Sequence, residues 1–191
     1  MVALVTIEGL TKRFPKQAEP ALRSVCTQIR SGHIVGLVGP DGSGKTTFLR
    51  LIAGLLRADE GGIDVGGFDP VANAKEVRAR IAYMPQRFGL YEDLSVEENL
   101  NLYADLRGLV GSARKATFER LLDFTGLAPF TGRLAGALSG GMKQKLGLAC
   151  ALVVTPELLL LDEPSVGVDP ISRRELWRMV SRLTDEGITV V

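Results

Sequence analysis

Cysteine and histidine are scarce in this chain of 191 residues, which contains two cysteines and a single histidine. Cys26 and Cys150 are too few for a disulfide framework, so the composition favours a reducing cytosol. With His33 as the single histidine, the composition also argues against a zinc cluster and against a Ser-His-Asp triad. The chemistry of this chain must therefore come from other residue types.

An excess of one charge and a long hydrophobic run are also lacking. Lys and Arg number 23 and Asp and Glu 22, which gives a net charge of +1. This balance argues against a protein whose main activity is to bind nucleic-acid backbones. The longest apolar run, residues 146–154, is roughly half as long as a membrane helix. Residues 1–7 are apolar, but no basic residue precedes them and Glu8 follows, so they do not match an export signal. We expect an intracellular protein.

Glycine is abundant, at 22 residues, and is concentrated in a few loops. Short β-rich runs alternate with helical patterns, which predicts an α/β fold with a parallel sheet covered by helices. The expected strands are residues 4–8, 25–29, 34–38, 63–65, 81–84, 158–161 and 188–191. The expected helices are residues 45–54, a helix that begins at Ser95 with a capping box to Glu98, and residues 113–125, 141–154 and 169–185.

The strand pattern disappears between residues 87 and 138, where only helical patterns remain. We interpret residues 1–191 as a single domain. Its α/β core covers about 1–86 and 157–191, and a helical subdomain at about 87–156 is inserted into it. The last expected strand reaches the final residue, Val191. Because a buried strand is an unusual place for a domain to stop, we expect the domain to be incomplete at its C-terminus.

Residues 39–46, with the sequence GPDGSGKT, match the pattern G-x-x-x-x-G-K-[ST] between an expected strand and an expected helix. Glycines let backbone N–H groups turn toward phosphate oxygens, and the helix N-terminus adds partial positive charge. In this interpretation Lys45 reaches the β- and γ-phosphates and the Thr46 hydroxyl binds Mg²⁺. A plain glycine-rich turn is the alternative, which the strand–loop–helix context disfavours.

Two further motifs follow along the chain. Residues 158–163 read LLLLDE, an apolar strand followed by Asp162 and Glu163 at the sheet edge where parallel sheets bind ligands. Beside a phosphate-binding loop, we expect Asp162 to hold Mg²⁺ and Glu163 to polarise an attacking water. Residues 138–144 read LSGGMKQ. Ser139 would cap the helix that follows, and Gly140 and Gly141 would leave the first N–H groups of that helix uncovered by side chains. An ordinary helix cap is the alternative for this third motif.

The ordered set of motifs resembles the nucleotide-binding domain of ABC transporters over the whole chain. It comprises residues 39–46, Gln86, and residues 138–144, 158–163 and 165–169. The resemblance implies a P-loop NTPase fold of the ABC ATPase type. Such a fold has a mostly parallel α/β core, an N-terminal antiparallel β part and an inserted helical subdomain.

Residues 83–91 and 162–176 narrow the resemblance to the drug-export branch, and within it to the first ATPase half of a tandem subunit. Asp41 stands where asparagine is common in the family, and residues 165–168 differ from its usual Ser-Ala-Gly-Leu. Neither difference removes a catalytic group.

The resemblance implies a role for each matching residue. Gln86 senses the γ-phosphate, Asp169 lies across a dimer interface, and Phe14 stacks on adenine, with a core phenylalanine as the alternative. The implied nucleotide contacts are Phe14, Gly39, Pro40, Asp41, Gly42, Ser43, Gly44, Lys45, Thr46, Thr47, Gln86, Ser139, Gly140, Gly141, Gln144 and Asp169, of which the residues from 139 onward contact nucleotide held by a partner domain. The implied catalytic residues are Lys45, Gln86 and Glu163. The implied Mg²⁺ ligands are Thr46, Gln86 and Asp162.

By the same resemblance, the protein hydrolyses ATP with Mg²⁺ and drives drug export through separate ABC-2-type permease subunits. Its partners are a second ATPase domain and the permease, with no nucleic acid. It is cytoplasmic and contacts the inner face of the cell membrane only through the permease.

Two alternatives remain open. A soluble ABC-type ATPase acting on ribosomes or nucleic acid is disfavoured by the near-zero net charge and by the short spacing between Lys45 and Ser139. A binding-only half of a tandem ATPase is disfavoured by Glu163. The switch histidine of the family would lie beyond Val191.

Overall fold

The chain divides into two units in the structure, a computed structural model that describes residues 3–15, 18–86 and 89–191. The first unit consists of Met1–Tyr83, Pro156–Asp162 and Leu183–Val191, and the second of Met84–Thr155 and Glu163–Arg182. The chain therefore crosses from the first unit to the second between Asp162 and Glu163. Arg87 and Phe88, part of the segment that resembles drug exporters, lie outside the described residues.

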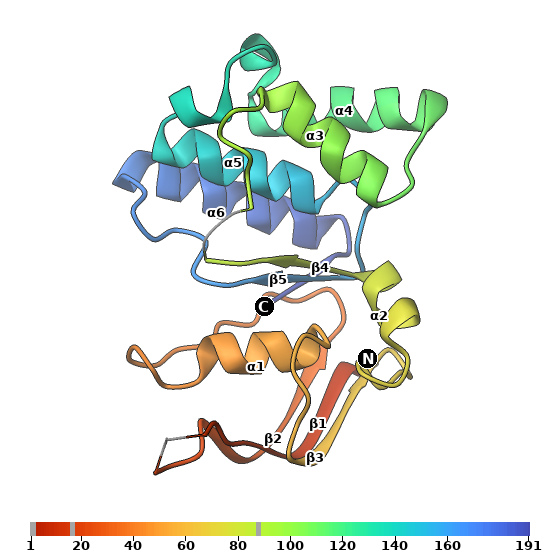
Figure 1. Ribbon diagram of the computed structural model, residues 1–191, viewed down its shortest axis with the longest axis vertical. Coiled ribbons are helices and arrows are strands. Elements are labelled where there is room, and N and C mark those ends of the chain that lie inside the picture. The colour runs from red at the N-terminus through yellow and green to blue at the C-terminus, as the bar shows by residue number, and fades with distance from the viewer. Residues whose placement is uncertain (1–2, 16–17, 87–88) are drawn as a thin grey trace. The chain divides into compact units, whose positions relative to one another are not determined.

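Alternating apolar residues near the N-terminus form an antiparallel sheet in the first unit (Figure 1). The sheet contains β1 (Ala3–Lys12), β2 (Leu22–Arg30) and β3 (Glu60–Val65) in the order β2-β1-β3. Val5 and Ile7 are buried on one face of β1 whereas Glu8 is exposed, as the two-residue period of a strand requires. The antiparallel β part that the resemblance implied is present.

A second sheet contains β4 (Ile81–Met84), β5 (Leu158–Leu161) and β6 (Thr189–Val190) in that order, and it lies in the first unit except for Met84. Strands β5 and β6 pair in parallel, with Leu158 opposite Thr189. All four residues of β5 are buried, which explains why they form a continuous apolar run rather than an alternating one. The carboxyl end of β5 leads directly to Asp162.

Helix α1 (Lys45–Ile52) supplies much of the core of the first unit. Its buried residues are Phe48, Leu49, Leu51 and Ile52. They belong to one apolar cluster with Val5 of β1 and Leu158 of β5, and Figure 1 shows α1 between the two sheets. Because this burial fixes α1, it also fixes the glycine loop from which the helix begins.

Residues 34–38, which the sequence predicts as a strand, do not form one. Ile34 makes an isolated parallel bridge to Val190, and the Val35 N–H donates to the Val190 carbonyl oxygen at 2.8 Å. Val38 is 99% exposed. Because β6 ends at Val190, this register leaves residues 36–38 without a neighbouring strand, and apolar residues alone cannot form a ladder. The expectation of a strand at residues 34–38 is wrong for this structure.

The second unit is helical and contains α3 (Val96–Leu106), α4 (Gly111–Thr125), α5 (Gly140–Ala151) and most of α6 (Pro170–Asp185), with short 3₁₀ helices at Ala128–Phe130 and Ala135–Ala137. Helix α5 packs against α3 and α4. The predicted capping box starts α3, because the Ser95 hydroxyl accepts from the Glu98 N–H and the Glu98 carboxylate accepts from the Ser95 N–H. In the described part of the chain, no helix has the length and apolarity needed to cross a membrane.

Helix α2 (Ala74–Arg80) belongs to the first unit and was not predicted from the sequence. Val77 is its one buried residue. A helix of seven residues with a single buried side chain has no apolar stripe, so periodicity gives no signal for it.

We predict that Gly54→Ala lowers the free energy of unfolding by about 2–4 kcal/mol. Gly54 follows α1 with a φ of +65°, and a Cβ there would lie 2.2 Å from the Pro70 carbonyl oxygen. The matched control is Gly126→Ala, which has a similar φ of +68° but no atom within 4 Å of the new Cβ. It should lose only about 1 kcal/mol from backbone strain. Urea unfolding measures both, and equal losses would contradict a steric constraint at Pro70.

Candidate functional site

The loop at residues 39–44 turns sharply into α1. The Ser43 N–H donates to the Pro40 carbonyl oxygen at 3.2 Å, and the Phe48 N–H donates to the Gly44 carbonyl oxygen at 2.8 Å. Gly44 is the N-cap of α1 with a φ of +92°, and a Cβ on it would lie 2.5 Å from the Ala21 carbonyl oxygen. Both the backbone conformation and this close approach therefore require glycine at the start of the helix.

A cavity of about 430 Å³ lies beside this loop within the first unit. Strand β2 contributes Leu22 and Val25 to its wall, and the loop contributes Gly39 and Pro40. Lys45 also lines the cavity, and its Nζ donates to the Gly39 and Pro40 carbonyl oxygens at 2.9 and 3.0 Å. A cation, a glycine loop and a helix N-terminus at a cavity of this size suit a phosphate-bearing ligand.

The other residues predicted for this loop differ in exposure. Asp41, Gly42 and Ser43 are exposed, whereas Thr46 and Thr47 are half-buried in the first turn of α1. All of them stay within one short stretch of the first unit. The predicted phosphate-binding loop is therefore partly open to solvent.

Phe14 does not belong to the described residues that line this cavity. It is half-buried, and the Lys12 ammonium lies 5.7 Å from the centroid of its ring. That contact is a cation–π interaction, which needs no nucleotide to explain it. The predicted stacking of Phe14 on adenine stays a prediction.

Asp162 follows β5 and is only 2% exposed. The Thr46 hydroxyl donates to its Oδ1 at 2.9 Å, and the Tyr83 hydroxyl donates to its Oδ2 at 2.9 Å. Burial is the main cause that raises the pKa of Tyr83, an interaction with Arg50 lowers it, and the Asp162 carboxylate raises it. Tyr83 is therefore protonated at neutral pH and able to donate.

The oxygen atoms gathered at the start of α1 suit a magnesium ion. Mg²⁺ binds carboxylate and other hard oxygen ligands and keeps positions for water and phosphate oxygens. Thr46 and Asp162 supply a hydroxyl and a carboxylate oxygen that lie 2.9 Å apart, and the buried negative charge of Asp162 favours a cation. This donor set fits the ion expected at these two residues. Gln86, the third expected ligand, belongs to the second unit.

Glu163 begins its stretch of the second unit in a strained backbone conformation, with a φ of +51°. For a residue other than glycine, this conformation costs about 1–2 kcal/mol. Glu163 Oε2 accepts a hydrogen bond from Gln86 Nε2 at 3.0 Å, so two of the three predicted catalytic residues lie in contact. Strain of this kind is concentrated at functional sites because the surrounding structure must hold it in place.

The LSGG segment begins α5 in the second unit. The Ser139 hydroxyl oxygen accepts from the Met142 N–H at 3.3 Å, so the predicted helix cap is present. Gly141 is buried, and a Cβ on it would lie 2.4 Å from the Ser172 hydroxyl oxygen at the start of α6. Gln144 Oε1 is buried and has no hydrogen-bond donor among the described residues. The small residues of the motif thus serve close packing of two helix starts.

Asp169 is the N-cap of α6. Its Oδ1 accepts from the N–H groups of Ile171 and Ser172, both at 3.0 Å. Hydrogen bonding to Ser172 is the main reason that the pKa of Asp169 is lowered, so the carboxylate is ionised at neutral pH. The N-cap predicted at this residue is confirmed, whereas its predicted place across a dimer interface stays a prediction.

The predicted residues come together in two groups, one in each unit. In the first unit Lys45 and Thr46 lie at the glycine loop, and Thr46 contacts Asp162. In the second unit Gln86 contacts Glu163, while Ser139 caps α5 and Asp169 caps α6. Tyr83 was missed from the sequence. The signal that could have found it is its position on the expected strand at residues 81–84, three residues before Gln86.

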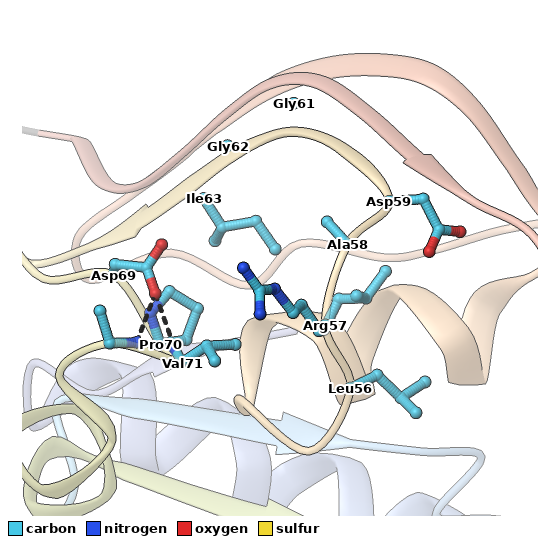
Figure 2. Close-up of a pocket in the computed structure, with 12 residues that line it drawn as sticks. Leu56, Arg57, Ala58, Asp59, Gly61, Gly62, Ile63, Asp69, Pro70 and Val71 are labelled. Carbon is cyan, nitrogen blue, oxygen red and sulfur yellow. Dashed lines mark hydrogen bonds between the residues drawn. The ribbon is translucent and has the colours of Figure 1, made fainter.

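A separate cavity of about 510 Å³ lies in the first unit between the end of α1 and β3 (Figure 2). Leu56, Arg57 and Asp69 are among the residues that line it. The Asp69 carboxylate accepts from the Val71 and Ala72 N–H groups at 2.8 and 2.7 Å, which is a local turn (Figure 2). None of its lining residues was predicted as a site residue.

Comparison with known proteins finds relatives of this chain. Residues 22–166 match the family described as ABC transporter. The chain is 62% identical over 189 residues to "Probable multidrug ABC transporter ATP-binding protein YbhF" of Escherichia coli (strain K12). It is 36% identical over 187 residues to "Doxorubicin resistance ATP-binding protein DrrA" of Mycobacterium tuberculosis (strain CDC 1551 / Oshkosh). These matches confirm the predicted resemblance to the family and to its drug-export members.

Solved structures give the same fold. A structure titled "Structure of ATP binding subunit of ABC transporter" is 29% identical with a TM-score of 0.84, and the match covers 98% of this chain and 78% of that one. The predicted ABC-type P-loop fold is confirmed. The alignment with YbhF covers 99% of this chain but only 33% of YbhF. The alignment with DrrA covers 98% of this chain and 56% of DrrA. The chain thus spans a third to about half of the length of these relatives.

We predict that Gly141→Ala lowers the free energy of unfolding by about 1–3 kcal/mol, because the new Cβ overlaps Ser172. The matched control is Gly140→Ala, whose Cβ would lie 3.4 Å from the Gly167 carbonyl oxygen, an ordinary contact. It should change stability by no more than about 0.5 kcal/mol. Adding Ser172→Gly to Gly141→Ala should recover part of the loss. Thermal and urea unfolding test this, and indistinguishable single variants would refute the packing role of Gly141.

Proposed function

Because this chain belongs to the ABC transporter family, we propose that it is an ATP-binding and ATP-hydrolysing domain that powers drug export through separate permease subunits. The observation that carries the proposal is the 2.9 Å contact between Thr46 and Asp162. It brings the helix start of a phosphate-binding loop to the carboxylate at the end of β5, the pairing that nucleotide hydrolysis in P-loop proteins requires.

In the proposed site, the loop at residues 39–44 and the N-terminus of α1 bind the phosphates of ATP. The backbone N–H groups and the helix dipole favour negative charge there. Lys45 exchanges its contacts with two loop carbonyl oxygens for the β- and γ-phosphates. Thr46 and Asp162 hold Mg²⁺, which, when bound, neutralises charge on the phosphate oxygens.

Glu163 is the proposed general base. Its carboxylate takes a proton from the attacking water, and Gln86 Nε2 donates a hydrogen bond to Oε2 at 3.0 Å. The strained backbone conformation of Glu163 sets the direction of its Cα–Cβ bond. The presence of a base at this position supports turnover over a domain that only binds ATP.

The starts of α5 and α6 are proposed to act on nucleotide held by a second ATPase domain. Ser139 and the glycines after it offer a second helix N-terminus for phosphate. Gln144 offers a buried carbonyl oxygen that lacks a donor among the described residues. The ionised Asp169 caps the neighbouring helix. In a pair of such domains, the helix start at Ser139 of each copy would contact the nucleotide bound by the other copy.

The permease and the exported drug are proposals that rest on the relatives. The names of YbhF and DrrA include a multidrug ABC transporter and doxorubicin resistance. We propose an ABC-2-type permease as the membrane partner, with this domain on the cytoplasmic face. Membrane contact would then be made only through that permease.

We predict that Lys45→Ala lowers ATP affinity by about 10- to 100-fold, because a charged hydrogen bond to phosphate is worth about 1.5–3 kcal/mol. Titration calorimetry with Mg-ATP measures the change. Lys75→Ala, on an exposed part of α2, is the matched control and should bind as the parent does. An unchanged affinity of Lys45→Ala would overturn the assignment of the phosphate-binding loop.

We predict that Glu163→Gln retains ATP binding and hydrolyses ATP about 10²- to 10⁴-fold more slowly. The amide keeps the shape of the side chain and an oxygen that can accept from Gln86, but it cannot take a proton from water. Glu186→Gln, an exposed change beyond α6, serves as the control. Steady-state turnover close to that of the parent would show that another group is the base.

A further inference from the structure

Tyr83 occupies a position that the proposed function does not yet use. It is the last residue of the first unit before the chain passes to the second at Met84. Its ring packs against the apolar core of the first unit, and its hydroxyl reaches Asp162 Oδ2 at 2.9 Å. A half-buried aromatic ring has only two side-chain torsions, so the hydroxyl is held at a defined point.

The Asp162 carboxylate therefore accepts hydrogen bonds from two different elements. Thr46 on α1 donates to Oδ1, and Tyr83 on β4 donates to Oδ2, each at 2.9 Å. A carboxylate with one donor can still rotate about its last torsion, whereas one with a fixed donor on each oxygen cannot do so without losing a hydrogen bond. The plane of this carboxylate is therefore set jointly by α1 and β4.

We propose that Tyr83 is a positioning residue that fixes the Asp162 carboxylate in the orientation in which it binds the Mg²⁺ of the nucleotide complex. The inference rests on the proposed ATP-binding function and deepens it. Removing the hydroxyl leaves Thr46 as a donor and leaves the loop at residues 39–44 intact. Only the magnesium-dependent part of nucleotide binding should suffer, because binding of the phosphates by the loop and Lys45 does not pass through Tyr83.

The test is the effect of Mg²⁺ on ATP affinity, measured by calorimetry with ATP in excess EDTA and with ATP in saturating Mg²⁺. In Tyr83→Phe, affinity in EDTA should equal that of the parent, and the gain in affinity on adding Mg²⁺ should fall on the order of tenfold. The matched control is Tyr103→Phe, which removes a hydroxyl that donates to the Gly89 carbonyl oxygen at 3.2 Å and should leave the gain unchanged.

A thermodynamic cycle separates positioning from a general structural effect. In an Asp162→Asn background, Tyr83→Phe should have no further effect on the gain from Mg²⁺, because the carboxylate that it positions is gone. Thermal unfolding without nucleotide verifies that each variant is folded.

The outcomes distinguish the two proposals. If the parent gains affinity from Mg²⁺ and Tyr83→Phe gains as much, the positioning role is overturned and the ATP-binding function stands. An equal loss in EDTA and in Mg²⁺ would also overturn it, because the residue would then support the fold or the loop. If the parent chain binds no ATP, or gains nothing from Mg²⁺, the proposed function fails and this inference fails with it.

Discussion

The burial of one negative charge constrains the arrangement of the first unit. Asp162 is nearly inaccessible to water, and an ionised carboxylate in such a place is stable only if donors replace the water that it has lost. Those donors come from Thr46 at the start of α1 and from Tyr83 on β4. The glycine loop, β4 and the end of β5 must therefore meet at one point. The apolar core beneath α1 holds the helix in the place that this meeting requires.

In each unit, a helix that carries a predicted motif begins where two segments of the chain approach closely. At Gly44 the start of α1 comes so near the Ala21 carbonyl oxygen that no side chain fits. At Gly141 the starts of α5 and α6 come so near each other that a single methyl group would overlap Ser172. Glycines that the sequence motifs assign to phosphate binding thus have a packing reason as well. The two reasons are compatible, since a bare backbone can approach both protein and ligand.

The sequence predicts most of the helices and strands that carry the candidate site, but it overestimates the extent of the second sheet. The helix starts at Lys45 and Ser95 and the strands at residues 81–84 and 158–161 follow from capping residues, glycine and apolar runs, all of which are local signals. Residues 34–38 have the composition of a strand, but a strand also needs a neighbour, and the register with Val190 provides one only for the first two residues. The contact of Tyr83 with Asp162 joins residues 79 positions apart, which no periodicity can reveal.

Asp162 and Glu163 are chemically similar neighbours in the chain, yet the structure gives them opposite surroundings. Asp162 is buried and has a donor on each oxygen, so its carboxylate is held still, which suits a group that binds a cation. Glu163 is more exposed, stands on a strained backbone and contacts a side-chain amide through one oxygen. The passage from the first unit to the second separates the two residues at this bond. A carboxylate that exchanges a proton with water needs access to water, and Glu163 has more of that access than Asp162.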